Sequence, residues 1–287
     1  MSRLFSLIQY FLPHHFITSL MGVIAESKFA KNFLIRAFIK IYNIDMTEVR
    51  NNRIDQYPNF NAFFTRELRE GARLIDNNPS VIVSPADGKL LAAGKINGDQ
   101  LIQAKNHYFS SSDLLGGNLS LANRFNNGKF ATIYLSPKDY HRVHMPLEGT
   151  LLQTIHIPGR LFSVGYATSS NIPNLFAQNE RLVCVFSTEA GLFCLVLVGA
   201  MIVGSIKTVW NKEIPKALTT PKIKEIDYKS QEKCMKLDKG AEVGRFELGS
   251  TVIVLFEQEF MQLNSNITAN KPIRMGESLG LIVSNFN

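Results

Sequence analysis

Residues 182–198 read LVCVFSTEAGLFCLVLV and contain two apolar runs, 182–186 and 193–198, separated by a polar segment with a glycine. Both runs are rich in β-branched and aromatic side chains, which is typical of buried strands bounded by turns. Runs of the same kind recur at 81–83, 130–135 and 251–256. Long helical periods are absent from residue 80 onward, apart from weak ones near 110–123 and 171–178. The sequence therefore predicts a β-rich body built from short strands.

Two turn segments in this body share the form Pro-x-x-Gly-x-Leu, at 85–90 and 146–151. Each joins two apolar runs. Such an echo favours paired β-hairpins in a sandwich of short strands, as in lipoyl- and biotinyl-type folds. We therefore expect an α+β fold, with N-terminal helices followed by a barrel-sandwich-like body, and the echo is consistent with a duplication.

The N-terminal region has a different character. Residues 4–24 contain no Asp, Glu, Lys or Arg, and a helix of this length would cover roughly 30 Å, enough to cross a bilayer. Gln9, Pro13, His14 and His15 would then lie near the bilayer centre, where a proline and desolvated polar groups are unfavourable. We expect two helices lying in the membrane interface. The alternatives are a helix pair packed on the core, a membrane span and a signal peptide.

Residues 28–42 support the interfacial alternative. Steps of 100° place an apolar set on one broad face and a basic set on the other, with Ile35 and Ile39 as exceptions on the basic side. The apolar set is Phe29, Phe33, Leu34, Ala37, Phe38 and Ile41, and the basic set is Lys28, Lys31, Arg36 and Lys40. The expected division is a helical, membrane-associating region over 1–72 and a β-rich catalytic domain over 73–287.

Composition excludes several classes of protein. The chain has 287 residues, is 45% hydrophobic and 19% charged, and carries a net charge of +7. It can bury a sizeable core, so wholesale disorder is excluded. Three cysteines without a Cys-x-x-Cys pair exclude a disulfide framework and a zinc ribbon. The positive charge permits a nucleic acid or an anionic lipid surface, and the scattered Lys and Arg residues argue against nucleic acid.

Three segments could carry chemistry. Asp87 follows an apolar run in a turn, His141 and His144 follow another, and Ser250 stands beside a glycine before a third. Each has an ordinary alternative: a turn aspartate, a pair of strand-end histidines, and a turn serine. Together they supply a carboxylate, an imidazole and a hydroxyl, which are the groups of an activated nucleophile. A metal pair would need a third ligand that no nearby residue signals, so we expect no metal site.

Leu248-Gly249-Ser250-Thr251 resembles the processing motif of phosphatidylserine decarboxylase proenzymes, the bacterial, membrane-associated and pyruvoyl-dependent type. Further resemblances to this family occur in order along nearly the whole chain, at 61–68 (NAFFTREL), 85–88 (PADG), 134–137 (YLSP), 141–146 (HRVHMP), 198–205 (VGAMIVGS) and 244–246 (GRF).

The resemblance implies self-cleavage between Gly249 and Ser250 into a large chain, 1–249, and a small chain, 250–287. His144 would deprotonate Ser250 while Asp87 holds the imidazole, and Ser250 would become a covalent pyruvoyl group. That group would form a Schiff base with phosphatidylserine, giving phosphatidylethanolamine and CO₂. His141 is the candidate for decarboxylation or head-group binding. The strand at 251–256 should keep the two chains associated after cleavage.

Tyr134 is a further candidate for substrate binding by the same resemblance. The implied enzyme is a peripheral protein on the cytoplasmic face of the cell membrane, acting in phospholipid biosynthesis. Its expected partners are phosphatidylserine and an anionic membrane surface, with a homodimer as an option. Two alternatives stay open: a barrel-sandwich carrier or binding module that uses His141 and His144 without self-cleavage, and a decarboxylase with a soluble amino-acid substrate.

Overall fold

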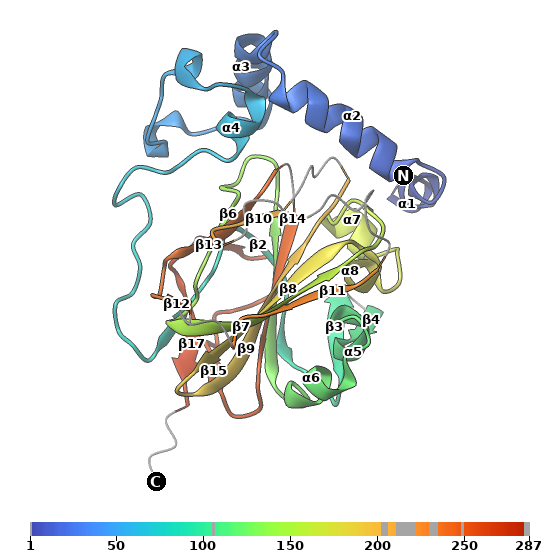
Figure 1. Ribbon diagram of the computed structural model, residues 1–287, viewed down its shortest axis with the longest axis vertical. Coiled ribbons are helices and arrows are strands. Elements are labelled where there is room, and N and C mark those ends of the chain that lie inside the picture. Colours follow the sequence, from blue (N-terminus) through green and yellow to red (C-terminus); the bar gives the residue numbers. More distant parts are fainter. Residues whose placement is uncertain are drawn as a thin grey trace.

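The structure is a computed structural model that describes residues 2–104, 107–201, 206–210, 222–229, 235–247 and 250–283 (Figure 1). The helices in that part are α1 (Ser2–Gln9), α2 (His14–Glu26), α3 (Lys31–Tyr42), η1 (Met46–Glu48), η2 (Ile54–Gln56), α4 (Phe60–Phe64), α5 (Ser111–Leu114), α6 (Leu119–Arg124), α7 (Tyr166–Ser169) and α8 (Leu175–Gln178).

The strands are β1 (Val81–Val83), β2 (Gly88–Lys95), β3 (Gln100–Ala104), β4 (His107–Ser110), β5 (Lys129–Leu135), β6 (Arg142–His144), β7 (Gly149–Ile157), β8 (Arg181–Thr188), β9 (Gly191–Val198), β10 (Ile206–Thr208), β11 (Lys224–Asp227), β12 (Lys236–Leu237), β13 (Glu242–Phe246), β14 (Ser250–Phe256), β15 (Met261–Leu263), β16 (Pro272–Ile273) and β17 (Ser278–Ile282). The expected α+β class is confirmed. The five apolar runs become β1, β5, β8, β9 and β14, and the weak helical periods become α5, α6 and α8.

A nine-stranded sheet forms the centre of the body. Its strands follow the order β11-β7-β8-β9-β14-β5-β2-β16, with β12 also paired to β7. Two three-stranded sheets, β1-β17-β15 and β10-β13-β6, and the pair β3-β4 complete the strands of the described residues. Every residue of β14 is buried, and the strand pairs with β9 on one side and β5 on the other. Burial on both faces explains why its sequence is continuously apolar rather than alternating.

The two Pro-x-x-Gly turns carry the chain from a small sheet into the large one. β1 and β6 belong to the small sheets, whereas β2 and β7, which begin at Gly88 and Gly149, belong to the large sheet. The strands on either side of each turn pair with other strands, so the expected hairpins are wrong. A crossing of this kind brings the backbone very close to the sheet. A Cβ at Gly88 would lie 2.3 Å from the carbonyl oxygen of Tyr134, which only glycine avoids.

The two turns are related by an internal two-fold symmetry. The backbone N–H of Val83 donates to Pro146 (2.9 Å), and the N–H of His144 donates to Pro85 (2.8 Å), so each turn repeats the other 61 positions away. The later strands repeat in the same way: the N–H of Gly276 donates to Ser84 (3.0 Å), and that of Gly240 to Met145 (2.9 Å). Even the register shifts in β2 and β7 occupy equivalent places. The duplication suggested by the sequence echo is therefore present in the structure.

The symmetry assigns each candidate site residue a counterpart in the other half of the body. The strands β2, β5 and β14 of one half correspond to β7, β8 and β9 of the other half. The paired residues Ile133 and Val252 therefore correspond to the paired residues Phe186 and Phe193. Three correspondences then follow: Glu148 matches Asp87, Ser80 matches His141, and Gly191 matches Ser250.

The N-terminal helices lie at one end of the body (Figure 1). α1 ends at Gln9 and α2 begins at His14, so the predicted interruption around Pro13 is present. No helix in the described part of the chain is long and apolar enough to cross a membrane. The polar residues of the interruption bind the body: Gln9 accepts a hydrogen bond from the N–H of Ser163 (2.8 Å), and the His14 ring packs edge-on against Phe162.

α3 packs against α4 through residues from both sides of the predicted pattern. Ile35, expected on the basic side, is fully buried against the cluster that includes Phe63 of α4, and Phe38 of the apolar face packs on Phe64. Phe33 and Ile41, also of the apolar face, are 72% and 74% exposed. Exposed apolar side chains are those that an interfacial helix would present to a membrane, and this membrane-facing role stays a prediction.

Candidate active site

Ser250 is the first residue of β14, opposite Leu135 of β5. The residue is 1% exposed, and its Oγ has no hydrogen-bond partner among the described residues. A buried hydroxyl without a partner costs about 1–3 kcal/mol, so it usually marks a functional group. Leu248 and Gly249, and with them the predicted cleavage bond, lie outside the described residues.

His144 ends β6, and both of its ring nitrogens are engaged. Nδ1–H donates to the carbonyl oxygen of Gly240 (2.8 Å), and Nε2 lies 3.1 Å from the hydroxyl of Tyr140. Because a carbonyl can only accept, Nδ1 carries the proton and Nε2 is the free base that accepts from Tyr140. Burial is the main cause that lowers the pKa of His144, and the hydrogen bond to Gly240 opposes it. The ring is therefore a neutral base at neutral pH.

Asp87 lies in the turn before β2 and is 6% exposed. Its carboxylate accepts hydrogen bonds from Arg73 Nε (2.9 Å) and from the N–H of Met275 (2.9 Å). The direct bond to His144 that the triad pattern suggests is not formed, because Gly240 takes the Nδ1 proton and Arg73 takes the carboxylate. The negative charge of Asp87 still acts to raise the pKa of His144, as one of the weaker influences on that ring.

His141 lies in the loop between β5 and β6 and is completely buried. Nδ1–H donates to the carbonyl oxygen of Asp139 (2.8 Å), and the ring centroid lies 4.1 Å from that of Phe64. Nε2 is buried without a partner among the described residues. Burial, helped by the positive charge of Arg66, lowers the pKa of His141 to about 3. This histidine therefore presents a bare acceptor nitrogen and not a proton donor.

The buried histidines should make the fold sensitive to acid. His141 has a pKa of about 3 in the folded protein and an ordinary value of 6.5, so the unfolded chain binds more protons between these values. Stability should be complete above the ordinary value and fall as pH drops through this window, by about 1.4 kcal/mol per pH unit per histidine. Urea unfolding of the Ser250→Ala protein across this range measures the slope. His141→Gln should reduce it, and an unchanged slope would contradict the assignment.

Tyr134 is on β5, directly opposite Thr251. Since paired residues share a face and neighbours along a strand alternate, Tyr134 points to the other face of the sheet from Ser250. Burial raises the pKa of its phenol, so the hydroxyl stays protonated at neutral pH.

The candidate segments converge at one end of the body. The N–H of Phe246, at the end of β13, donates to the carbonyl oxygen of His141 (3.1 Å), and β13 leads toward Ser250. The Asp87 turn touches the same strand pair through the bond from His144 to Pro85.

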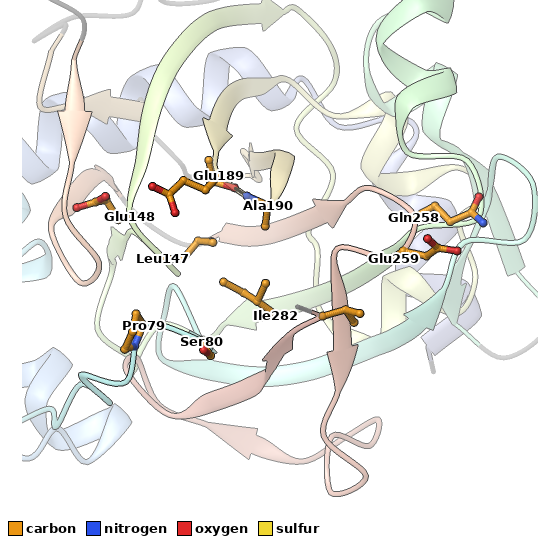
Figure 2. Close-up of a pocket in the computed structure, with 11 residues that line it drawn as sticks. Pro79, Ser80, Leu147, Glu148, Glu189, Ala190, Gln258, Glu259 and Ile282 are labelled. Carbon is orange, nitrogen blue, oxygen red and sulfur yellow. Dashed lines mark hydrogen bonds between the residues drawn. The ribbon is translucent and has the colours of Figure 1, made fainter. Parts of the chain in front are cut away.

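The symmetry-related place in the other half surrounds a cavity of about 530 Å³ (Figure 2). Glu148 and Ser80, the counterparts of Asp87 and His141, line it together with Ala190. This symmetry-related place has Gly191 in place of Ser250 and Val83 in place of His144, so it lacks the counterparts of the candidate nucleophile and base. Only one of the two equivalent places carries the reactive groups.

A second cavity of about 360 Å³ lies between the N-terminal helices and the body. Its lining is almost entirely apolar: Met21, Ile24, Ala25, Leu34, Ala37, Phe38, Ile41, Tyr42, Phe60, Phe64, Pro137 and Met201. Phe64, which lines this groove, also packs on the buried ring of His141, so a single side chain links the groove to that histidine.

Sequence reasoning missed three neighbours of the site: Arg73, Tyr140 and Gly240. Arg73 and Gly240 have no local signal, because one makes contacts distant in sequence and the other acts through its backbone. Tyr140 lies four residues before His144, and this spacing was a local signal that sequence reasoning did not use. Among the described residues no cluster of His, Cys, Asp and Glu could hold a metal ion. Cys184 and Cys194 are buried, and burial raises the pKa of both thiols, which makes them unreactive.

Comparison with known proteins assigns a family. The family model described as phosphatidylserine decarboxylase matches residues 60–281, and a model described as PSD matches residues 4–43. A phosphatidylserine decarboxylase proenzyme of Pseudomonas fluorescens is 50% identical over 97% of both chains. Proteins of the same name from Ectopseudomonas mendocina and Pseudomonas entomophila are 50% and 48% identical, over 97% and 98% of this chain and 98% of each relative. The chain therefore belongs to the phosphatidylserine decarboxylase family and is a carboxy-lyase.

Proposed function

We propose that this chain is a self-processing, pyruvoyl-dependent decarboxylase that converts phosphatidylserine to phosphatidylethanolamine and CO₂. The observation that carries the proposal is the Ser250 hydroxyl, buried and without a partner at the start of a central strand. The relatives are named proenzymes, which fits a chain that must be processed before it acts.

Self-cleavage would begin with transfer of the Ser250 proton to Nε2 of His144. Tyr140 must first release that nitrogen, which it contacts at 3.1 Å. The Ser250 oxygen then bonds to the carbonyl carbon of Gly249 and the peptide C–N bond breaks, so the amide becomes an ester. Loss of the α-proton of residue 250 and of its Cβ–O bond releases the Gly249 carboxylate. Water replaces the resulting enamine nitrogen, which leaves as ammonia.

The buried, unpartnered position of Ser250 fits the pyruvoyl group that this sequence would leave there. A pyruvoyl carbonyl supplies an electron sink for the decarboxylation of an amine-bearing substrate. His141 would accept a hydrogen bond from the head-group amine at its bare Nε2. Proton return by His141 would require a change in its surroundings, because burial keeps the ring neutral.

The apolar groove supports a lipid substrate. Its walls come from α2, α3 and α4 on one side and from Pro137 and Met201 of the body on the other. One end lies at Phe64, beside His141. An acyl chain in the groove would bury its methylenes, each worth about 0.8 kcal/mol, and would place the head group toward the histidine. A soluble amino-acid substrate would leave this apolar surface unused.

The N-terminal helices would hold the protein on the membrane as a peripheral protein. Most of the large apolar side chains that the protein exposes lie in residues 5–42, including Phe11 (88%), Phe29 (87%) and Phe33 (72%). Exposed aromatic side chains near lysines are typical of helices that insert shallowly into an anionic interface. A homodimer stays an untested option.

Replacing Phe29 and Phe33 together by serine should release the protein from vesicles. Each buried phenylalanine contributes about 1.5–3 kcal/mol, so the partition coefficient should fall about tenfold or more. Co-flotation with vesicles containing an anionic lipid measures it. Leu119→Ser is the control, since this leucine is 65% exposed on α6 at the opposite end of the body (Figure 1). Equal losses in both variants would place the membrane contact elsewhere. Substitution is preferable to deletion because Ile35 of α3 is part of a buried cluster.

The mass of the purified protein tests the proposal directly. Two chains, with the small one blocked at its N-terminus by a keto-acyl group, are expected. A single unmodified polypeptide that does not release CO₂ from phosphatidylserine would favour the carrier alternative instead.

A further inference from the structure

The carboxylate of Asp87 is held by a side chain that lies outside the β-rich body. Arg73 belongs to the segment between α4 and β1 and donates from Nε and from Nη2 (2.5 Å to Oδ2). The two side chains are only 7% and 9% exposed. The same guanidinium binds Glu48 of η1 (2.9 Å), whose other oxygen binds Arg274 (3.1 Å). A two-nitrogen contact of this kind fixes the direction of the carboxylate as well as its place.

The symmetry-related half provides an internal comparison. Glu148, the counterpart of Asp87, is 56% exposed and pairs at the surface with Lys236. The one of the two equivalent places that receives Arg73 is also the place where His144 and Ser250 lie.

A buried charge is unfavourable unless it is paired and hydrogen-bonded, and the contact from Arg73 supplies both for Asp87. A carboxylate that is fixed in direction can stabilise the positive imidazolium that forms when His144 accepts the Ser250 proton. The other charged or titratable groups within electrostatic reach of Asp87 are Arg66, Asp139, Tyr140 and His144. Among the described residues, Arg73 makes the direct ion pair with Asp87.

We propose that Arg73 is a positioning residue for self-cleavage, which holds the Asp87 carboxylate in a fixed direction within electrostatic reach of His144. The segment that follows the membrane-associating helices thereby sets how fast the precursor cuts itself. This inference rests on the proposed self-processing. It adds a residue from outside the β-rich body to the expected set of Asp87, His144 and Ser250.

Arg73→Gln tests the proposal in full-length precursor that is pulse-labelled during cell-free translation and chased at several pH values. Cleavage should slow at least about tenfold, because a misplaced Asp87 loses part of the general-base effect. Arg73→Lys, which keeps the charge, should cleave within several-fold of the parent at every pH.

Two controls separate this effect from general damage. Glu148→Gln changes the counterpart of Asp87, and Arg124→Gln removes an arginine that pairs with Glu257, just beyond the end of β14 that is opposite Ser250. Neither should slow cleavage. If Arg73→Gln does not fold, as judged by melting in the Ser250→Ala background, Arg73→Lys decides: cleavage supports the proposal, and a folded but uncleaved protein overturns it.

Parent-like cleavage of Arg73→Gln at every pH would also overturn the proposal, as would a loss that Arg73→Lys does not restore. Failure of the parent chain itself to cleave would instead overturn the proposed self-processing.

Discussion

Ser250→Ala should abolish both self-cleavage and decarboxylation. The substitution removes the only oxygen that the mechanism can use at this position, so the protein should run as one band on a denaturing gel. The fold should survive, because the hydroxyl has no hydrogen-bond partner to lose within the described part of the chain. Removing an orphaned buried hydroxyl should even stabilise the precursor slightly. Gel analysis, intact mass and CO₂ release from phosphatidylserine measure the result.

Thr251→Val is the matched control for this substitution. Thr251 is the next residue of β14, and its Oγ1 is likewise buried without a partner. Valine keeps the shape and removes the hydroxyl. Normal cleavage of Thr251→Val beside an uncleaved Ser250→Ala is the expected pair of results. A cleaved Ser250→Ala protein would place the reactive bond elsewhere.

The two histidines of the β5–β6 region should separate into two different defects. His144→Gln should leave the precursor uncut, since it removes the base, whose contribution is about 10²–10⁴ in rate. His141→Gln should cut normally and then turn over poorly, because the substrate amine loses its acceptor. Two measurements separate the defects. A pulse-chase experiment measures how far cleavage is delayed, and an activity assay measures the turnover of the cut protein.

The distinction depends on geometry, because both rings are neutral at neutral pH. His144 has Tyr140 on its free nitrogen, whereas the free nitrogen of His141 has no partner among the described residues. An uncut His141→Gln protein, or a fully active one, would remove His141 from its proposed role. A normally cut His144→Gln protein would do the same for His144.

The body of the fold could be predicted from the sequence, and the arrangement of its sheets could not. β8, β9 and β14 are apolar because they are buried on both faces, and this burial is visible as continuous runs. The turns at Pro85 and Pro146 were recognisable as an echo. Their backbone does not form hairpins but crosses from one sheet to another, which depends on contacts with β5 and β8.

Candidate site residues could be named from the sequence where the proposed chemistry needs a particular residue type, as at Ser250 and the histidines, and their roles stay predictions. The arrangement was not predictable where a backbone group or a distant side chain takes a role that the sequence pattern assigns to another residue. The carbonyl of Gly240 fixes the His144 tautomer, a task that sequence logic gives to Asp87. Arg73 reaches Asp87 across a segment of irregular backbone, and no spacing rule anticipates such a contact. Ile35 shows the same limit in α3, where packing against α4 overrides the helical pattern.

The central position of β14 in the large sheet affects whether the protein can refold. The strand is laid between β9 and β5 while it is still part of one polypeptide, when its effective concentration at that gap is roughly millimolar or higher. Once the bond before it is cut, a denatured molecule would have to recapture a free 38-residue peptide by diffusion. The uncut chain could refold repeatedly after denaturation. The cut protein would form its native state once, before cleavage, and would not recover that state after unfolding.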